Sequence, residues 1–332
     1  EPRNRIPIIY SLEDNERIVM KAKLLIPSQY RSSFVPTVKV FYDNLVECLE
    51  HSPDISLSVY ENAREFHNDV ADEEITYHTK NKDSVNVKIG YLPDHFYIDR
   101  SGFSGWSTLA NGNWTPLYSD EKANERFNVI SDHYINNNIS KYKQNDSTQG
   151  KKLESGYVSI FTQIPTDIVS HFMPVRWDVF LKSLVEEILK ANPLEKIVIK
   201  RHPRCSDKRM SRTIYDIQNR YGKNVKMTDA SIHQCISQSR AVFVGNSGVG
   251  FEALLHLKPV FSFAHSDYHH ATINTTLDNV GNYENQIDAF DEAFRQKIRH
   301  FVTYYLDSYM ATYEPDRIAR RLNDIGFFDT KK

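Results

Sequence analysis

Residues 157–265 alternate between short apolar runs and amphipathic stretches, and this alternation restricts the fold more than any other feature of the chain. Strands are expected at 157–163, 196–203, 224–229, 241–246 and 259–265, and helices at 175–192, 208–221, 231–239 and 248–257. The strand runs are almost continuously apolar, which is typical of strands buried on both faces. Strands that alternate with helices form a parallel sheet wrapped by helices. We therefore predict an α/β domain with a parallel sheet in the second half of the chain.

The first half shows a weaker pattern of the same kind. Strands are expected at 6–10, 55–60 and 85–94, a helix at about 37–50, and an ordered loop in the aromatic, Gly- and Ser-rich stretch at 95–107. Residues 136–155 are the most polar part of the chain and are typical of a linker. We therefore predict an N-terminal domain at 1–150 and a C-terminal domain at 151–332, whose last helices, at 286–307 and 314–325, can pack back on the first domain. Two such domains form a cleft at the carboxyl ends of their strands, where ligands bind.

Charge and composition exclude several classes of protein. The net charge of −2 gives no electrostatic basis for nucleic-acid binding, and no apolar run approaches the roughly 20 residues that span a bilayer. Three widely spaced cysteines fit neither a zinc site nor a disulfide framework, so a reducing cytoplasm is the expected location. The N-terminus lacks a signal-peptide core, and a longer parent protein could still carry a membrane anchor.

The glycine-rich corner Gly245-Asn246-Ser247-Gly248-Val249-Gly250 joins an expected strand to an expected helix. Glycines let a ligand approach the backbone, and a helix start offers free N–H groups and partial positive charge, so a phosphate is the favoured ligand. A tight turn with Ser247 as the helix N-cap is the alternative. Glu252, in the first turns of the helix, would either complement the helix dipole or accept the hydroxyls of a ribose.

Further polar groups follow two other strands of the same predicted sheet. After the second strand come Lys200, Arg201, His202, Pro203 and Arg204. Such a cationic cluster favours phosphate contact over a solvent-facing edge, and Pro203 would help to aim His202. After the first strand come Gln163 and Asp167, and this carboxylate could be a nucleophile or base, or could merely cap a short helix.

The 94–107 loop contributes a second set of polar groups from the first half. It carries Asp94, Asp99, Arg100 and Ser101. These side chains could face an acceptor and activate its hydroxyl. Alternatively, the loop is stacked on Trp106 and pinned by salt bridges.

The His-Pro pair, the Asn-Ser-glycine corner followed by "GFEALL", and "KPV" before the next strand resemble capsule-synthesis glycosyltransferases. More narrowly, the chain resembles the retaining β-Kdo transferases of bacterial capsule and O-antigen (lipopolysaccharide) assembly. The resemblance extends over about 157–270, with "GYLPDHFYIDRSGFSGWS" (90–107) in the first half. It implies a GT-B-like α/β fold, in which two Rossmann-like domains with parallel sheets face a central cleft.

The resemblance also implies roles for individual residues. His202 and the amides at Ser247 would converge from neighbouring strands on the phosphate of one CMP, Glu252 would bind its ribose, and Asp167 would attack the anomeric carbon. The implied nucleotide-sugar site comprises Gln163, Lys200, Arg201, His202, Pro203, Ser231, Ile232, Asn246, Ser247, Gly248, Gly250 and Glu252, with Ser231 and Ile232 bordering the cytosine. Asp94 would serve the acceptor side together with Asp99, Arg100 and Ser101. The chain lacks the Glu-Asp-Gly form of the acceptor-side motif, which leaves the choice between Asp94 and Asp99 open.

The implied reaction moves Kdo from CMP-β-Kdo to a bacterial surface glycan with retention, through a covalent adduct on aspartate. No metal or cofactor is expected, because cations and a helix start can stabilise the leaving CMP. Lys200, Arg201 or Arg204 could pair with the sugar carboxylate. The expected partners are the donor and a lipid-linked or oligosaccharide acceptor, at the inner face of the bacterial inner membrane if other parts of a parent protein attach there. A sialyltransferase, a UDP-sugar epimerase and a non-catalytic nucleotide- or glycan-binding module remain the alternatives.

Overall fold

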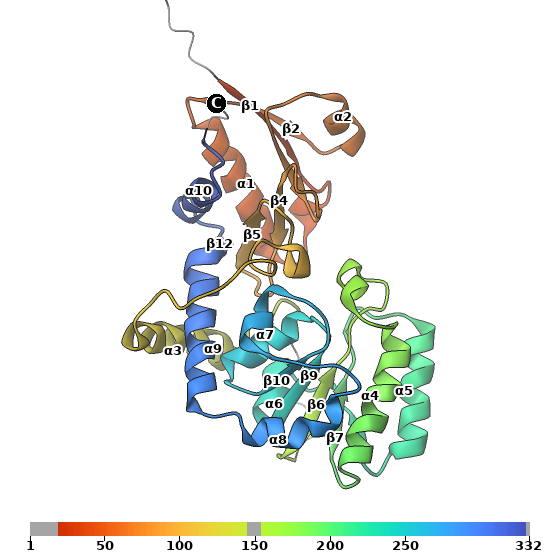
Figure 1. Cartoon of the computed structure of the whole chain (residues 1–332). Helices are drawn as coiled ribbons and strands as arrows, with labels where there is room; N and C mark the ends of the chain where they lie inside the picture. The colour runs from red at the N-terminus through yellow and green to blue at the C-terminus, as the bar shows by residue number, and fades with distance from the viewer. Residues whose placement is uncertain (1–18, 145–153, 330–332) are drawn as a thin grey trace, which may run out of the picture.

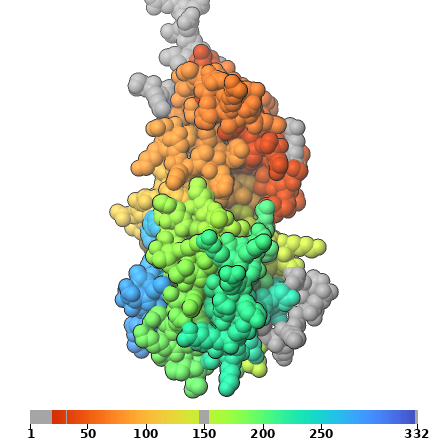
Figure 2. Space-filling model, turned by 90° about the vertical axis from the view of Figure 1, so that its right-hand side faces the viewer, coloured from red at the N-terminus to blue at the C-terminus, as the bar shows by residue number. Residues whose placement is uncertain are grey.

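A computed structural model describes residues 19–144 and 154–329 and contains two sheets stacked along the long axis of the molecule (Figure 1). The first sheet and its helices form the N-terminal lobe, and the second sheet and its helices form the C-terminal lobe. The space-filling view shows the elongated outline of the two stacked lobes (Figure 2). The strand predicted at 6–10 and the central part of the linker predicted at 136–155 lie outside the described residues.

The sheet of the N-terminal lobe has the order β12-β5-β4-β3-β1-β2. Its strands are β1 (Met20–Leu25), β2 (Ile55–Tyr60), β3 (Glu73–Tyr77), β4 (Val85–Ile89), β5 (His95–Asp99) and β12 (Ala311–Thr312). Strands β1 to β4 pair in parallel, whereas β5 is antiparallel to both β4 and β12. The predicted strand at 55–60 and the predicted helix, observed as α1 (Pro36–Glu50), are confirmed. The short helix α2 (Ala63–Asn68) follows β2.

The prediction of a loop at 95–107 is wrong for the first five residues, because these form strand β5. All five are buried, because β5 lies between β4 and β12 inside the sheet. A strand buried on both faces shows no polar–apolar alternation, and the sequence of β5 therefore lacks the pattern by which a half-buried strand is recognised. Strand β1 and helix α3 (Asp120–Asn136) were also missed.

The sheet of the C-terminal lobe is parallel throughout, with the order β11-β10-β9-β6-β7-β8. Its strands are β6 (Tyr157–Phe161), β7 (Ile197–Lys200), β8 (Val225–Met227), β9 (Ser239–Val244), β10 (Val260–Ser262) and β11 (Ile273–Asn274). The helices between them are α4 (Trp177–Ala191), α5 (Lys208–Tyr221), α6 (Ile232–Gln238) and α7 (Gly248–Leu255). The predicted order of strands and helices is therefore confirmed.

Both faces of this sheet are buried. Val158 and Ile160 of β6 belong to the core under α4 and α5, whereas Tyr157 and Phe161 of the same strand belong to the core under α6 and α7. The second core continues across the lobe boundary to Tyr97 and other residues of the N-terminal lobe. A continuous apolar core between the lobes fixes how the two sheets face each other.

The C-terminal segment returns to the N-terminal lobe. After α8 (Tyr283–Asp288), helix α9 (Glu292–Tyr304) runs along the C-terminal lobe and ends in a π-helical turn at 305–309. Strand β12 then pairs with β5, and α10 (Pro315–Asp324) packs on α1 (Figure 1). Arg100, whose side chain bonds to Glu73, also donates to the carbonyls of Ile325 and Gly326 and so holds this segment in place.

Candidate functional site

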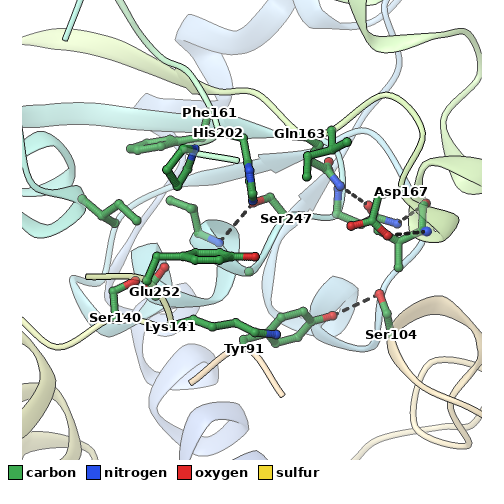
Figure 3. A pocket seen from close by; sticks show the side chains of 18 of the residues that line it. Tyr91, Ser104, Ser140, Lys141, Phe161, Gln163, Asp167, His202, Ser247 and Glu252 are labelled. Atoms are coloured by element: carbon green, nitrogen blue, oxygen red, sulfur yellow. Dashed lines mark hydrogen bonds between the residues drawn. The ribbon is translucent and has the colours of Figure 1, made fainter. Parts of the chain in front are cut away.

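A pocket lies between the lobes, at the carboxyl edge of the second sheet (Figure 3). Parallel strands bring the segments after β6, β7 and β9 to this edge, and the N-terminal lobe adds β4 and the segment after α3. The predicted site residues that line it are Gln163, Asp167, Lys200, Arg201, His202, Pro203, Ile232, Asn246, Ser247, Gly248 and Glu252. The predicted site residues that do not line it are Asp94, Asp99, Arg100, Ser101, Ser231 and Gly250.

The glycine-rich corner opens helix α7 toward the pocket. Ser247 caps the helix, because its Oγ accepts a hydrogen bond from the N–H of Val249 (3.3 Å). The alternative of a helix cap is therefore confirmed, and Ser247 also lines the pocket. Gly245 has no room for a Cβ, which would overlap Gln163 Oε1 and lie 2.6 Å from Met173 Sδ. The corner thus combines a tight backbone turn with the positive end of a helix dipole, which favours an anion.

Gly250 has a different role from the one predicted. A Cβ at this position would lie 2.6 Å from the hydroxyl of Tyr268, so the glycine admits the buried tyrosine ring rather than a ligand. That hydroxyl donates to the carbonyl of Ser247 (2.6 Å). Gly250 and Tyr268 therefore support the corner from behind.

Gln163 and Asn246 hold the corner against the loop that follows β6. Gln163 Nε2 donates to Asn246 Oδ1 (2.8 Å), and the backbone N–H of Asn246 donates to Gln163 Oε1 (3.0 Å). Asn246 Nδ2 donates in turn to the carbonyls of Val169 and His265, both at 3.0 Å. Since both amides are buried and bonded to protein atoms, they position the pocket wall more than they offer groups to a ligand.

His202 presents one ring nitrogen to the pocket. Its Nδ1 accepts a hydrogen bond from the N–H of Arg204 (3.2 Å), so the neutral imidazole carries its proton on Nε2. Burial lowers the pKa of His202; the cations Arg204 and Lys141 also lower it, and Asp167 opposes them. His202 follows β7 and Ser247 follows β9, with β6 between these strands, so the expected origin in neighbouring strands is wrong. The two residues nevertheless line one pocket.

Asp167 lies in the loop between them, after β6. Its Oδ1 accepts a hydrogen bond from the N–H of Val169 (3.3 Å) and caps a short 3₁₀ helix at Ile168–Phe172. Its carboxylate also lines the pocket (Figure 3) and raises the pKa values of Lys88, Lys141 and His202. Asp167 is therefore both a helix cap and an anion among the cations of the pocket.

The basic residues after β7 are largely engaged by the protein. Lys200 Nζ donates to the carbonyl of Ala230 (2.6 Å), and Arg201 Nη2 donates to the carbonyl of Asp207 (3.2 Å). The guanidinium of Arg204 lies over the ring of Phe34, 5.1 Å from its centre. Lys200 and Arg201 line the pocket edge, and each head group already bonds to a backbone carbonyl, although Nε of Arg201 has no partner among the described residues.

The predicted acceptor-side residues organise the N-terminal lobe instead of facing the pocket. Asp99 is fully buried and accepts hydrogen bonds from the backbone N–H groups of Ser101, Gly102 and Thr108 and from the Tyr309 hydroxyl. A carboxylate at the end of a central strand must be satisfied locally, and these donors do so. The salt bridge from Arg100 to Glu73 likewise matches the alternative of a pinned loop.

Asp94 and Ser231 are also turned to protein partners. Asp94 bonds to His95 and to the Tyr134 hydroxyl; burial raises its pKa, but these bonds outweigh burial and leave the pKa below its ordinary value. Ser231 caps α6 by accepting from the N–H of Gln234 (3.1 Å). Ile232, by contrast, lines the pocket.

The N-terminal lobe contributes pocket residues that sequence reasoning missed. They are Lys88 and Tyr91 from β4 and the turn after it, Ser104 from the loop after β5, and Ser140, Lys141 and Tyr142 from the segment after α3. A lysine inside the apolar run 85–89 was one signal, and the stretch at 90–107 that carries the family resemblance, which contains Tyr91 and Ser104, was another. The 140–142 segment was hidden in the stretch assigned to the linker.

Glu252 is the most unusual carboxylate of the pocket. It is only 2% exposed, and its Oε1 has no hydrogen-bond partner among the described residues. Burial raises its pKa to about 8, against the opposing effects of the nearby Ser140 hydroxyl and Lys141 ammonium. A buried oxygen without a partner is costly, and a ligand hydroxyl would satisfy it.

The raised pKa predicts how Glu252→Gln changes stability with pH. Between the ordinary value of 4.5 and about 8, the folded state binds more protons than the unfolded state, so wild-type stability falls as the pH rises through this window. Glutamine removes this loss. We expect the variant to be more stable than wild type by about 2–4 kcal/mol at pH 8 and nearly unchanged at pH 4.5. Urea denaturation at both pH values measures the difference, and parallel pH profiles would contradict the prediction.

Asp167 and Glu252 are the carboxylates that line the pocket. Within residues 19–144 and 154–329, no three His, Cys, Asp or Glu side chains gather closely enough to hold a metal ion. In the same ranges, no helix combines the length and apolar character that crossing a bilayer requires.

Two α/β lobes whose sheets face one pocket define a GT-B-like fold. Residues 144–305 match the family described as capsule polysaccharide biosynthesis protein, so the predicted resemblance to capsule-synthesis proteins is confirmed. Protein FixF of Sinorhizobium fredii is 28% identical over 187 residues, which cover 54% of this chain and 45% of FixF. The match thus spans less than half the length of that curated relative.

Two solved structures from Thermosulfurimonas dismutans share the fold. The KpsC beta Kdo 2,4 transferase superposes with a TM-score of 0.50 at 16% identity and covers 85% of this chain and 89% of that one. The KpsC beta Kdo 2,7 transferase superposes with a TM-score of 0.50 at 14% identity, and the match covers 91% of this chain and 98% of that one. At this level of identity, the likeness establishes the fold.

Proposed function

We propose that the chain is a retaining glycosyltransferase that moves Kdo from CMP-β-Kdo to a bacterial surface glycan. The observation that carries this proposal is the meeting of His202, the start of helix α7, Glu252 and Asp167 in one pocket between two Rossmann-like lobes. The match to capsule-synthesis proteins and the fold shared with Kdo transferases support it.

The donor nucleotide would bind to the C-terminal lobe. The Nε2–H of His202 and the start of α7 would hold the CMP phosphate, and the unpartnered oxygen of Glu252 would accept a ribose hydroxyl. These donors would stabilise the negative charge that grows on the phosphate as CMP leaves. The proposed chemistry therefore requires no metal or other cofactor.

Asp167 would act as the nucleophile. Its Oδ1 is used by the helix cap, which orients the carboxylate and leaves Oδ2 for attack on the anomeric carbon. The bond from this carbon to the phosphate oxygen breaks and CMP departs. The acceptor hydroxyl then attacks the same carbon, loses its proton to a base and releases Asp167, and two inversions give net retention.

Intact-protein mass spectrometry with freshly generated CMP-Kdo tests this proposal. Without an acceptor, we expect one Kdo-sized adduct, which peptide mapping places on Asp167, together with release of CMP. Addition of a lipid-linked or oligosaccharide acceptor should discharge the adduct. The absence of both adduct and CMP release across a competent series of acceptors would refute the proposal.

Nucleotide preference separates this function from that of a UDP-sugar epimerase. We expect CMP to raise the melting temperature by a few degrees at concentrations at which UDP has little effect, because binding to the folded state alone stabilises it. Differential scanning fluorimetry measures both shifts. A larger shift with UDP would favour the epimerase. Binding of CMP without any turnover would favour the non-catalytic module.

A further inference from the structure

Two lysines of the pocket have no role in the proposed chemistry so far. Lys88 lies on β4 of the N-terminal lobe, and Lys141 lies in the segment after α3. Both line the pocket, and Figure 3 shows Lys141, beside Tyr91, on the side opposite His202. The pocket therefore has a cation on the wall opposite His202, and Lys141 still lies within electrostatic range of His202 and Glu252.

Neither ammonium forms an ion pair in the described parts of the chain. Lys88 Nζ lies over the ring of Phe103, 4.1 Å from its centre, and Lys141 Nζ donates to the carbonyl of Gly90 (2.9 Å). Burial lowers the pKa of Lys88 to about 8 and that of Lys141 to about 7, although Asp167 opposes this in both cases. Lys88 also lowers the pKa of Lys141, and two partly desolvated cations within electrostatic range of each other are unfavourable unless an anion joins them.

The position of the two lysines indicates which anion this would be. The phosphate is already provided for by His202 and the start of α7. Lys88 and Lys141 instead line the wall that the N-terminal lobe contributes to the pocket. Asp167 acts electrostatically on Lys88, Lys141 and His202 alike, so it lies within range of both walls. A ligand that extends from the phosphate past Asp167 would bring its next group to the lysines.

We propose that Lys88 and Lys141 bind the carboxylate of the donor sugar and thereby select acidic 2-keto sugars over neutral ones. This inference rests on the proposed function and replaces the earlier expectation for Lys200, Arg201 and Arg204. In such a sugar the carboxylate is attached to the anomeric carbon, so holding it also positions the carbon that Asp167 attacks. The two ammoniums offset the repulsion between the sugar carboxylate and the carboxylate of Asp167.

The experiment measures binding without turnover. All variants carry Asp167→Asn, so that the donor binds without reacting. Stopped-flow fluorescence then measures the affinities for CMP and for freshly generated CMP-Kdo. The variants compared are Lys88→Met, Lys141→Met and the two matching arginine substitutions. Each methionine should weaken CMP-Kdo binding by about 10- to 100-fold and leave CMP binding within about twofold. Arginine, which keeps the charge, should restore part of the affinity. Lys143→Met, an exposed neighbour, is the control and should change neither.

Three results would overturn the inference. Equal losses for CMP and CMP-Kdo would place the lysines at the phosphate. Unchanged affinity for both nucleotides, together with a raised KM for the acceptor when the same lysine substitutions are made in the otherwise wild-type, active protein, would place the lysines at the acceptor. Unchanged affinities for CMP and CMP-Kdo, together with an unchanged KM for the acceptor, would show that the lysines contact no ligand. Because binding is measured in an inactive background, failure of the wild-type protein to transfer Kdo would refute the proposed function separately.

Discussion

Replacing Asp167 with asparagine should lower the rate of Kdo transfer by at least about 10³-fold while leaving the affinity for CMP within about twofold of wild type. An amide is not a nucleophile toward the anomeric carbon, so the first displacement is lost. Asparagine is also a good N-cap, so the bond from the N–H of Val169 and the 3₁₀ helix after it should persist. Loss of activity would then report on chemistry and not on folding.

Initial rates of CMP release measure the loss of transfer activity, and calorimetry measures the affinity for CMP. Asp278→Asn, a change at an exposed carboxylate outside the pocket, is the control and should behave as wild type. Transfer by Asp167→Asn at the wild-type rate would show that another group attacks the sugar. A parallel collapse of CMP affinity would show that Asp167 holds the nucleotide site together.

The second large effect is expected for Asp267→Ala, which should lower the free energy of unfolding by about 3–5 kcal/mol. Asp267 is fully buried and accepts hydrogen bonds from the hydroxyls of Tyr91 (2.7 Å), Tyr97 (2.6 Å) and Tyr305 (3.0 Å). Tyr91 and Tyr97 belong to the N-terminal lobe, so the carboxylate ties the lobes together. Alanine would remove the acceptor that these three buried hydroxyls share and leave them only the weaker bonds from Tyr91 to Ser104 and between Tyr97 and Tyr305, and it would also create a cavity.

Urea denaturation measures this loss, with Asp278→Ala as the exposed control, expected to change stability by less than about 0.5 kcal/mol. The Tyr91 hydroxyl also bonds to Ser104 at the pocket wall (3.1 Å). We therefore expect the same variant to weaken CMP-Kdo binding. A stability loss below about 1 kcal/mol would mean that the apolar core alone holds the lobes in place.

The C-terminal lobe could be predicted from the sequence because its signals are local. Each strand is a short apolar run, each helix has its own amphipathic period, and Ser231 and Ser247 mark helix starts that the structure confirms. The N-terminal lobe could be predicted only in part. Strand β5 gave no period, because both its faces are buried, and it is completed by β12 from the far end of the chain. No local pattern reports a pairing across more than two hundred residues.

The sequence by itself determined that polar groups follow β6, β7 and β9, because parallel strands deliver their carboxyl ends to one edge. It could not determine which polar residues of the first half would reach that edge. Only the tertiary structure decided that Asp99 turns inward to backbone donors while Lys88 and Lys141 line the pocket. The physical reason is that a buried charge takes whatever partner the packed lobes bring to it, and that partner is set by long-range contacts and not by neighbours in the chain.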